Sequence, residues 1–298
     1  MWPAFGFEPH FARYLEFDDA LGVEDTWVIE SGERIVSGVQ IFTRPIRIAG
    51  ERLLLGGIGS VATHPDHEGQ GLATRVLREA VRDMEERGMA LSLLFTTRIS
   101  FYERFDWVQI PYRVFACREP RPFDDSGIRT ARMSDLSWLM DLYAGYTEEL
   151  DGVTLRDKAY WEGQLRFAGN PGEDFRVIER EGEPVAYARS ILEEGRTRVM
   201  EFARAEGSAG ELGRVLASMT PAGEALFIPD AHDPDLLAAC RARFADCESM
   251  EFEDQMWRIL DRGRLSGLVG GGADRTDREL LARIVGADRG LFWPSDRF

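Results

Sequence analysis

The 298-residue chain is poor in the features of secreted, zinc-binding and membrane proteins. It has three cysteines, Cys117, Cys240 and Cys247, and none is in CxxC spacing, so neither a disulfide framework nor a zinc site is indicated. No apolar run approaches the ~20 residues of a membrane span. The first residues also lack the basic and apolar regions of a signal peptide. These absences predict a cytoplasmic protein with no membrane partner.

Basic residues are outnumbered, with 36 Lys and Arg against 52 Asp and Glu and a formal net charge of −16. Nucleic-acid binding depends on basic patches that neutralise phosphates, so a nucleic-acid partner is not expected. An acidic protein is compatible with attracting small cations. Asp18, Asp19, Glu24 and Asp25 either line a pocket for a polyamine-like or aminoglycoside-like cation or form a solvated acidic face, and the second interpretation is favoured.

The most informative stretch begins at Leu53 and ends at Gly88. An apolar, strand-like run reaches Val61, a turn with a proline and two glycines follows, and then a helix with apolar residues at helical spacing. The first N–H groups of a helix have no intrahelical partner and the macrodipole is positive there, so this pattern predicts an anion cradle that needs no lysine. Gly69 and Gly71 remove side chains where a ligand touches backbone. An ordinary strand-to-helix connection is the alternative.

Three other motifs are excluded or disfavoured at this turn. It is not the Walker loop, because no Gly-Lys-Ser/Thr follows, and it lacks the third glycine of the dinucleotide fingerprint. His64, Asp66 and His67 are too closely spaced in one loop to indicate a metal site, so no metal is expected.

The order of strands and helices over residues 1–118 recurs over residues 128–260, which predicts an α/β chain of two similar units. Residues 107–117 are expected to close the first unit, and residues 254–260 to be the last strand of the second. Residues 263–274 are glycine-rich, and a flexible linker is favoured over a phosphate loop. The apolar end of the chain predicts a docked tail. The expected segments are residues 1–120, 123–262 and 263–298.

The segment Glu68-Gly69-Gln70-Gly71-Leu72-Ala73 resembles the coenzyme A pyrophosphate loop of the GNAT acetyltransferases, Arg/Gln-x-x-Gly-x-Gly/Ala, with Glu68 in the first position. Residues 101–107 resemble the family's Tyr-x-Arg-Phe-Gly-Tyr/Phe segment, with Asp106 in place of glycine. With the repeated units and the aromatic terminus, the chain is similar to the enhanced intracellular survival (Eis) branch. The resemblance implies two tandem GNAT-like mixed-sheet units plus a short C-terminal tail. The N-terminus is shortened, and residues 263–298 are too few for the third domain of that branch.

The resemblance also implies a reaction, in which acetyl passes directly from acetyl-CoA to a primary amine. Tyr102 would be the general acid for the departing thiolate, and the C-terminal carboxylate of Phe298 the general base. The second unit lacks the loop and is expected not to bind coenzyme A. A small cationic amine is the implied acceptor, and relatives assemble into oligomers. The residues implied at the cofactor are Val61, Thr63, Glu68, Gly69, Gln70, Gly71, Ala73, Thr74 and Thr97.

Two alternatives stay open at this point. Glu68 places a negative charge beside a pyrophosphate, and with the shortened N-terminus this fits a non-catalytic coenzyme A-binding or scaffold protein. The second alternative is an acyltransferase that uses a longer acyl group.

Overall fold

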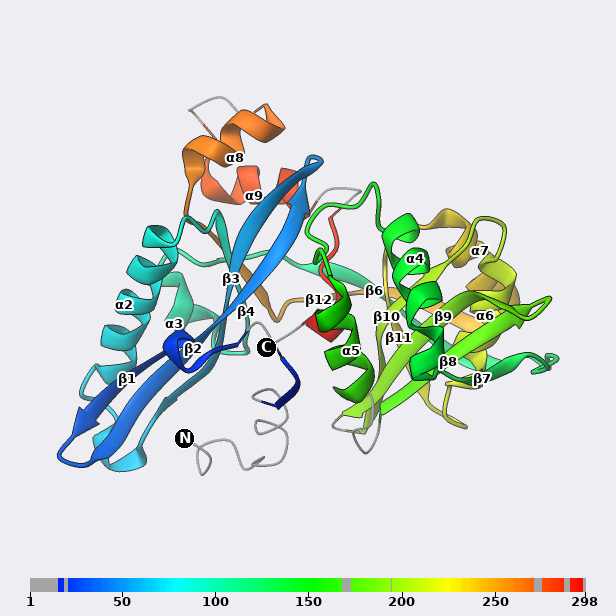
Figure 1. Ribbon diagram of the computed structural model, residues 1–298, viewed down its shortest axis with the longest axis horizontal. Helices are drawn as coiled ribbons and strands as arrows, with labels where there is room; N and C mark the ends of the chain where they lie inside the picture. The colour runs from blue at the N-terminus through cyan, green and yellow to red at the C-terminus, as the bar shows by residue number, and fades with distance from the viewer. Residues whose placement is uncertain are drawn as a thin grey trace.

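The computed structural model describes residues 16–18, 21–167, 173–193, 195–270, 275–286 and 290–296. Figure 1 shows two lobes, each built on a twisted sheet, with the end of the chain lying between them. This mixed α/β architecture with two sheets confirms the predicted fold class. None of the helices described here is long and apolar enough to cross a membrane.

The first sheet has the strand order β1-β2-β3-β4-β13-β5. The first three strands form an antiparallel meander, and β3 then pairs in parallel with β4 across helix α2. Short helix α3 follows β4. The bounds are β1 Thr26–Ser31, β2 Arg34–Ile48, β3 Glu51–Thr63, α2 Leu72–Glu86, β4 Leu91–Phe95, α3 Ile99–Glu103, β5 Val108–Gln109 and β13 Gln255–Ile259.

The second sheet has the order β12-β6-β11-β10-β9-β8-β7. Helix α6 connects the parallel strands β10 and β11, as α2 connects β3 and β4. The bounds are β6 Tyr112–Pro120, β7 Ile128–Thr130, α4 Leu136–Tyr146, α5 Lys158–Phe167, β8 Glu173–Arg180, β9 Glu183–Glu193, β10 Arg196–Arg204, α6 Ala209–Ser218, β11 Ala225–Pro229, α7 Pro234–Arg243 and β12 Phe244–Phe252. Short 3₁₀ turns are η2 Val23–Asp25, η3 Pro65–His67, η4 Met133–Asp135 and η5 Pro294–Asp296.

The two lobes exchange one strand each. Strand β6 follows β5 in the chain but lies in the second sheet between β11 and β12. Strand β13 follows β12 but lies in the first sheet between β4 and β5. The expectation that residues 107–117 close the first sheet is therefore wrong beyond Gln109, and residues 254–260 do not close the second. Pro111 separates β5 from β6, because proline cannot donate a ladder hydrogen bond.

Both faces of the first sheet are covered. On one face α2 buries the residues predicted from its periodicity, among them Val76, Leu77 and Met84. On the other face lie α8 Arg262–Val269 and α9 Asp277–Ile284, whose leucines join the same core as Trp257 of β13. The glycine-rich segment thus begins as a helix, which corrects the linker expectation for residues 263–269.

The C-terminal tail packs against both lobes. Phe292 lies 6.1 Å from the ring of Phe95 in the first lobe, and Trp293 lies 4.8 Å from Phe202 in the second. Both tail side chains are buried. Asp296 is fully buried and pairs with Arg156 at 2.8 Å. Figure 1 shows this tail, in red, running between the lobes.

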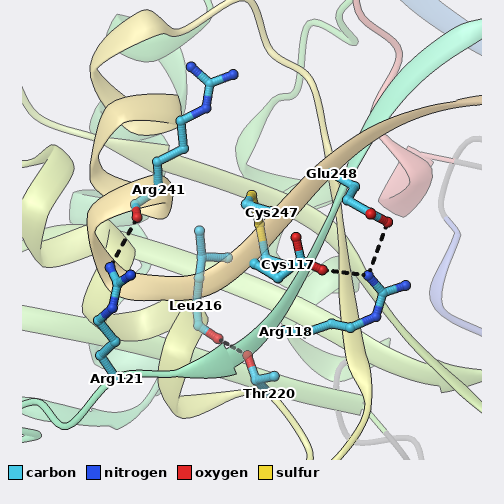
Figure 2. Close-up of a disulfide and its surroundings, with 9 residues drawn as sticks. Cys117, Arg118, Arg121, Leu216, Thr220, Arg241, Cys247 and Glu248 are labelled. Atoms are coloured by element: carbon cyan, nitrogen blue, oxygen red, sulfur yellow. Dashed lines mark hydrogen bonds and ion pairs between the residues drawn. A yellow bond between two sulfur atoms is a disulfide. The ribbon is translucent and has the colours of Figure 1, made fainter.

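A disulfide joins Cys117 of β6 to Cys247 of β12 (Figure 2). The two residues are directly opposite each other in the antiparallel pairing. The sequence indicated no disulfide framework, and this bond corrects that expectation; its two cysteines are 130 residues apart in the chain. Cys240 is a buried free cysteine. The disulfide joins β6, the first strand after the chain passes into the second lobe, to β12, the last strand before the chain returns to the first.

Candidate active site

Strands β3 and β4 diverge at their carboxyl ends. In the described chain their parallel pairing is confined to Leu55 with Leu91, Gly56 with Ser92 and Gly57 with Leu93. Strand β3 nevertheless continues to Thr63, and its register against β2 shifts between Gly38 and Gln40. Ser60 takes a positive φ of 53° at this bulge. The β3 edge beyond Gly57 thus has backbone groups that β4 does not pair, which is what an extended ligand requires.

The loop after β3 leads directly into an open helix end. His64 accepts a hydrogen bond at Nδ1 from the Asp66 N–H, at 3.2 Å, and so begins the short turn η3. Gly69 and Gly71 have φ values of 74° and 73°, in the left-handed region that glycine adopts at least cost. Gly71 is the N-cap of α2 and offers no side-chain cap to the first N–H groups. This helix end is therefore available to an anion.

Two exposed charges of opposite sign, Glu68 and Arg75, lie near this helix end in the sequence. Glu68 is exposed and has no ion-pair partner among the residues described. The first turn of α2 holds no acidic residue, and Arg75 is exposed one turn into the helix. Arg75 was not selected from the sequence. Because the loop itself has no Lys or Arg, a cation near the start of the helix is the feature that would have indicated it as a phosphate-binding residue. Arg75 can compensate for Glu68 near a pyrophosphate.

Tyr102 lies on α3, beyond the end of β4. Its ring contacts Phe101 at 4.9 Å and Trp107 at 6.2 Å. Burial raises the pKa of Tyr102 to about 12, against a small lowering by Arg98. The hydroxyl therefore keeps its proton throughout the neutral range. It is a donor rather than a base at physiological pH.

Strand β13, which follows the second unit in the chain but lies in the first sheet, contacts the turn after α3. Arg258 of β13 donates to the carbonyl of Phe105 and lies 3.6 Å from Asp106. Its guanidinium also lies over the Trp107 ring, 5.3 Å from the centroid. Asp106 has a left-handed conformation, with φ of 63°. The C-terminal half of the chain thus supports the helix that presents Tyr102.

The residues selected from the sequence gather at one edge of the first sheet, with one exception. Val61 and Thr63 end β3, the loop and α2 residues follow directly, and Thr97 is exposed just after β4. Val61 and Tyr102 pack against the same hydrophobic cluster. The Thr63 hydroxyl lies 3.0 Å from that of Ser37. Phe298 lies outside the described residues, and the tail is placed as far as Asp296.

The N-terminal acidic residues differ from the expected solvated face. Asp18 is 8% exposed and pairs with buried Arg44 at 2.5 Å. Asp25 is also buried, pairs with Arg87 at 2.8 Å and accepts a hydrogen bond from the Gly22 N–H. Glu24 is exposed, and Asp19 lies outside the described residues. Arginine partners thus neutralise the two described aspartates.

The equivalent place in the second unit is closed by side chains. Strands β10 and β11 also diverge, after two parallel pairs. Arg204 at the end of β10 binds Asp233 beyond β11 at 2.8 Å, and the Tyr146 hydroxyl donates to the same carboxylate. Trp293 of the tail packs nearby on Phe202 of β10. Acidic Glu211 lies in the first turn of α6, which disfavours an anion there.

Comparisons with known proteins concern the first unit and the overall fold. Residues 3–110 match the family model described as an acetyltransferase (GNAT) domain. No curated protein matches the sequence. Among solved structures, a GCN5-related N-acetyltransferase from Anabaena variabilis is similar with a TM-score of 0.67 at 15% identity, covering 89% of this chain and 69% of that one.

Two further structures share the fold. Eis1 from Mycobacterium abscessus has a TM-score of 0.59 at 14% identity, covering 89% of this chain and 74% of that one. Saccharomyces cerevisiae N-myristoyltransferase, solved with bound myristoyl-CoA, has a TM-score of 0.57 at 10% identity, covering 85% and 70% of the two chains. Residues 3–110 thus match an acetyltransferase (GNAT) domain, which supports an acyltransferase, and the fold of the two units is shared with these solved structures.

Proposed function

We propose that the protein transfers acetyl from acetyl-CoA to a small cationic primary amine at the first unit. The observation that carries this proposal is the divergence of β3 from β4 beside the uncapped N-terminus of α2. The unpaired β3 edge suits an extended amide-containing arm, and the helix end suits a pyrophosphate. A single ligand with both groups in sequence, coenzyme A, satisfies both features.

The loop residues have distinct roles in this proposal. The backbone of Val61 and Thr63 binds the pantetheine arm, and one N–H polarises the thioester carbonyl. The amides of Gly69, Gly71, Ala73 and Thr74 surround the pyrophosphate together with Gln70, while Glu68 turns to solvent. Thr97 lies beside the arm at the end of β4.

Direct transfer requires two proton movements. The amine attacks only as the neutral base, so it must lose a proton, and the departing thiolate must gain one. Tyr102 supplies the second proton, since its raised pKa keeps the hydroxyl protonated. A tyrosine with pKa near 12 is a weaker acid than the thiol of pKa ~8.5, so the transfer is uphill and needs the tyrosinate to be stabilised, for which Arg98 is the neighbouring cation. By resemblance to the Eis branch, the Phe298 carboxylate accepts the proton of the amine.

A non-catalytic coenzyme A-binding protein is the second candidate. The exposed negative charge of Glu68 beside the helix end is the observation that favours it. Both candidates bind coenzyme A, but only the first transfers acetyl from acetyl-CoA.

Coenzyme A release from acetyl-CoA, measured across a panel of polyamines and amino sugars, tests the proposal. Turnover with at least one amine is expected, whereas cofactor binding without turnover favours the second candidate. Succinyl-CoA and propionyl-CoA in parallel test a longer acyl group. One residue added after Phe298 is expected to lower the rate if its carboxylate is the base.

A matched pair of glycine variants tests the anion cradle directly. Gly71→Ala and Gly50→Ala both place a side chain at a positive φ, 73° and 81°, with no atom within 4 Å of the added carbon. Each is expected to lose about 1 kcal/mol of stability. Only Gly71→Ala should weaken coenzyme A binding, because Gly50 lies in the hairpin between β2 and β3. Equal affinity in the two variants would contradict binding at this turn.

A further inference from the structure

A cavity of about 220 Å³ lies where the two lobes and the tail meet. The second lobe contributes Tyr112 and Arg113 of β6, Asp230 and His232 after β11, and Glu251 of β12. Strand β13 and the tail contribute an apolar floor that includes Trp257, Leu291 and Phe292. The volume is below the ~300–1,000 Å³ of drug-sized ligand pockets, so it suits a molecule of one ring or one short chain.

The polar groups around this interlobe cavity have unused hydrogen-bonding capacity. Gln255 is 6% exposed and lines the cavity, and its side-chain amide makes no hydrogen bond to the described residues. The amide is reached from the cavity, so a ligand or solvent molecule there can bond to it. His232 bonds the Gly290 carbonyl through Nε2 at 2.9 Å. A carbonyl only accepts, so Nε2 carries the hydrogen, and Nδ1 of the neutral ring is an acceptor.

The charge of the lining favours a cation. Arg113 pairs with Asp230 at 2.5 Å, which leaves those two charges mutually compensated. Glu251 stands opposite Arg113 in the pairing of β12 with β6, yet no ion pair of Glu251 occurs within the described ranges. The lining thus has one carboxylate in excess, together with acceptors on Gln255 and His232. Aromatic side chains at the floor add favourable surface for a cation with an apolar body.

We infer that the interlobe cavity binds a small organic ammonium ion, with Glu251 and Gln255 as its polar contacts. The site is separate from the proposed cofactor groove, because Gln255 pairs with Phe95 on the side of β4 away from β3. The inference therefore does not depend on acetyl transfer. The proposed ligand class is a primary ammonium group attached to one ring or a short apolar chain.

Titration calorimetry of the full chain without acetyl-CoA tests this inference. The probes are 2-phenylethylamine and 3-phenylpropionate, which are similar in size and opposite in charge. Saturable binding is expected for the amine and not for the acid. Glu251→Gln should weaken amine binding roughly 5-fold, since it removes the charge of an exposed carboxylate while keeping a hydrogen-bond acceptor. Gln255→Leu should weaken it several-fold.

The control is Glu248→Gln, which removes the same charge from β12 where Glu248 pairs with exposed Arg118. Amine affinity should stay unchanged in this variant and in the presence of saturating coenzyme A. Preferential binding of the acid, no binding of either probe, or an equal loss in the two glutamate variants would overturn the inference. Displacement of the amine by coenzyme A would show that the sites are not separate.

Discussion

Arg156 is the side chain on which the buried junction between the lobes and the tail depends most. It is fully buried and binds Glu201 at 2.7 Å and Asp296 at 2.8 Å, both themselves 1% exposed or less. The Tyr160 hydroxyl donates to the same aspartate at 2.7 Å. Arg156→Met keeps an unbranched but shorter side chain and removes its charge, leaving two buried carboxylates without this cation. Removing one partner of a buried pair costs about 3–5 kcal/mol.

That loss converts into a measurable melting shift. At roughly 2 cal/mol/K per residue, 298 residues give an unfolding entropy of about 0.6 kcal/mol/K. A loss of about 4 kcal/mol therefore lowers the Tm by about 7 °C. The matched control is Arg118→Met, because Arg118 also has two carboxylate partners but is 40% exposed. Exposed pairs contribute about 0–1 kcal/mol, so the control should melt within about 2 °C of wild type.

The pH dependence of the loss gives a second, independent test. Burial is the largest single influence and raises the pKa of Glu201, but the charge and hydrogen bonds of Arg156, together with Arg189 and Ser295, leave the net pKa lowered. In the wild type this carboxylate therefore adds stability above its unfolded pKa of ~4.5, and the gain is lost as pH falls through the folded value. Without Arg156, burial dominates and the pKa of Glu201 rises.

The difference in unfolding free energy between wild type and Arg156→Met should then shrink as the pH falls from 7 towards 5. Thermal melts at both pH values, followed by circular dichroism, measure it. A loss under 1 kcal/mol at pH 7, or one as large at pH 5 as at pH 7, would refute the reasoning that this cluster is a charge-compensated anchor.

Four further predictions follow from other parts of the molecule. Glu68→Gln should tighten coenzyme A binding a few-fold at low salt and less at high salt, and calorimetry showing weaker binding would contradict a repulsive role. Trp293→Ala should cost about 3–5 kcal/mol in denaturant unfolding, because a fully buried indole is removed from the junction. Because Cys240 is the one free cysteine, unreduced unfolded protein should titrate one thiol. The Cys117–Cys247 bond closes a loop of about 130 residues, which contributes up to about 5 kcal/mol in the chain-entropy model. Its reduction should therefore lower the denaturant midpoint. Tyr102→Phe should lower kcat roughly 10²- to 10⁴-fold with little change in cofactor affinity, and the wild-type rate should show no loss from Tyr102 ionisation between pH 7 and 10, since its pKa is about 12.

Local sequence patterns predicted most of the fold around the candidate site. The helical spacing of Leu72, Val76 and Met84 marked the buried face of α2, and Gly88 marked its end at a φ of 71°. Asp106 takes a left-handed φ of 63° at the position where the family segment has glycine, and Asp tolerates that conformation better than most residues. These features depend on interactions within a few residues, so a single sequence contains them. The positions of the loop between β3 and α2 and of the ends of β3 and β4 were predicted from local patterns in the same way.

Local sequence patterns could not predict which distant strands pair with each other. Strand β12 was missed because its residues from Ala245 to Glu251 alternate little and most are exposed, as an edge strand allows. The exchange of β6 and β13 could not be read either, because each strand has the same apolar pattern in either sheet. The cross-strand meeting of Cys117 and Cys247 depends on that exchange. Only the three-dimensional register reveals these contacts.

The exchange makes the two units depend on each other. Without β13, β4 would become an edge strand, and the turn after α3 would lose Arg258. Without β6, strands β11 and β12 would have no common partner. A closed second unit is thus retained as a scaffold, since it supplies the strand that orders the Tyr102 helix. Expression of residues 1–120 alone should therefore give no folded acetyltransferase domain. Addition of residues 121–298 as a separate chain should restore binding of coenzyme A only if β13 inserts between β4 and β5.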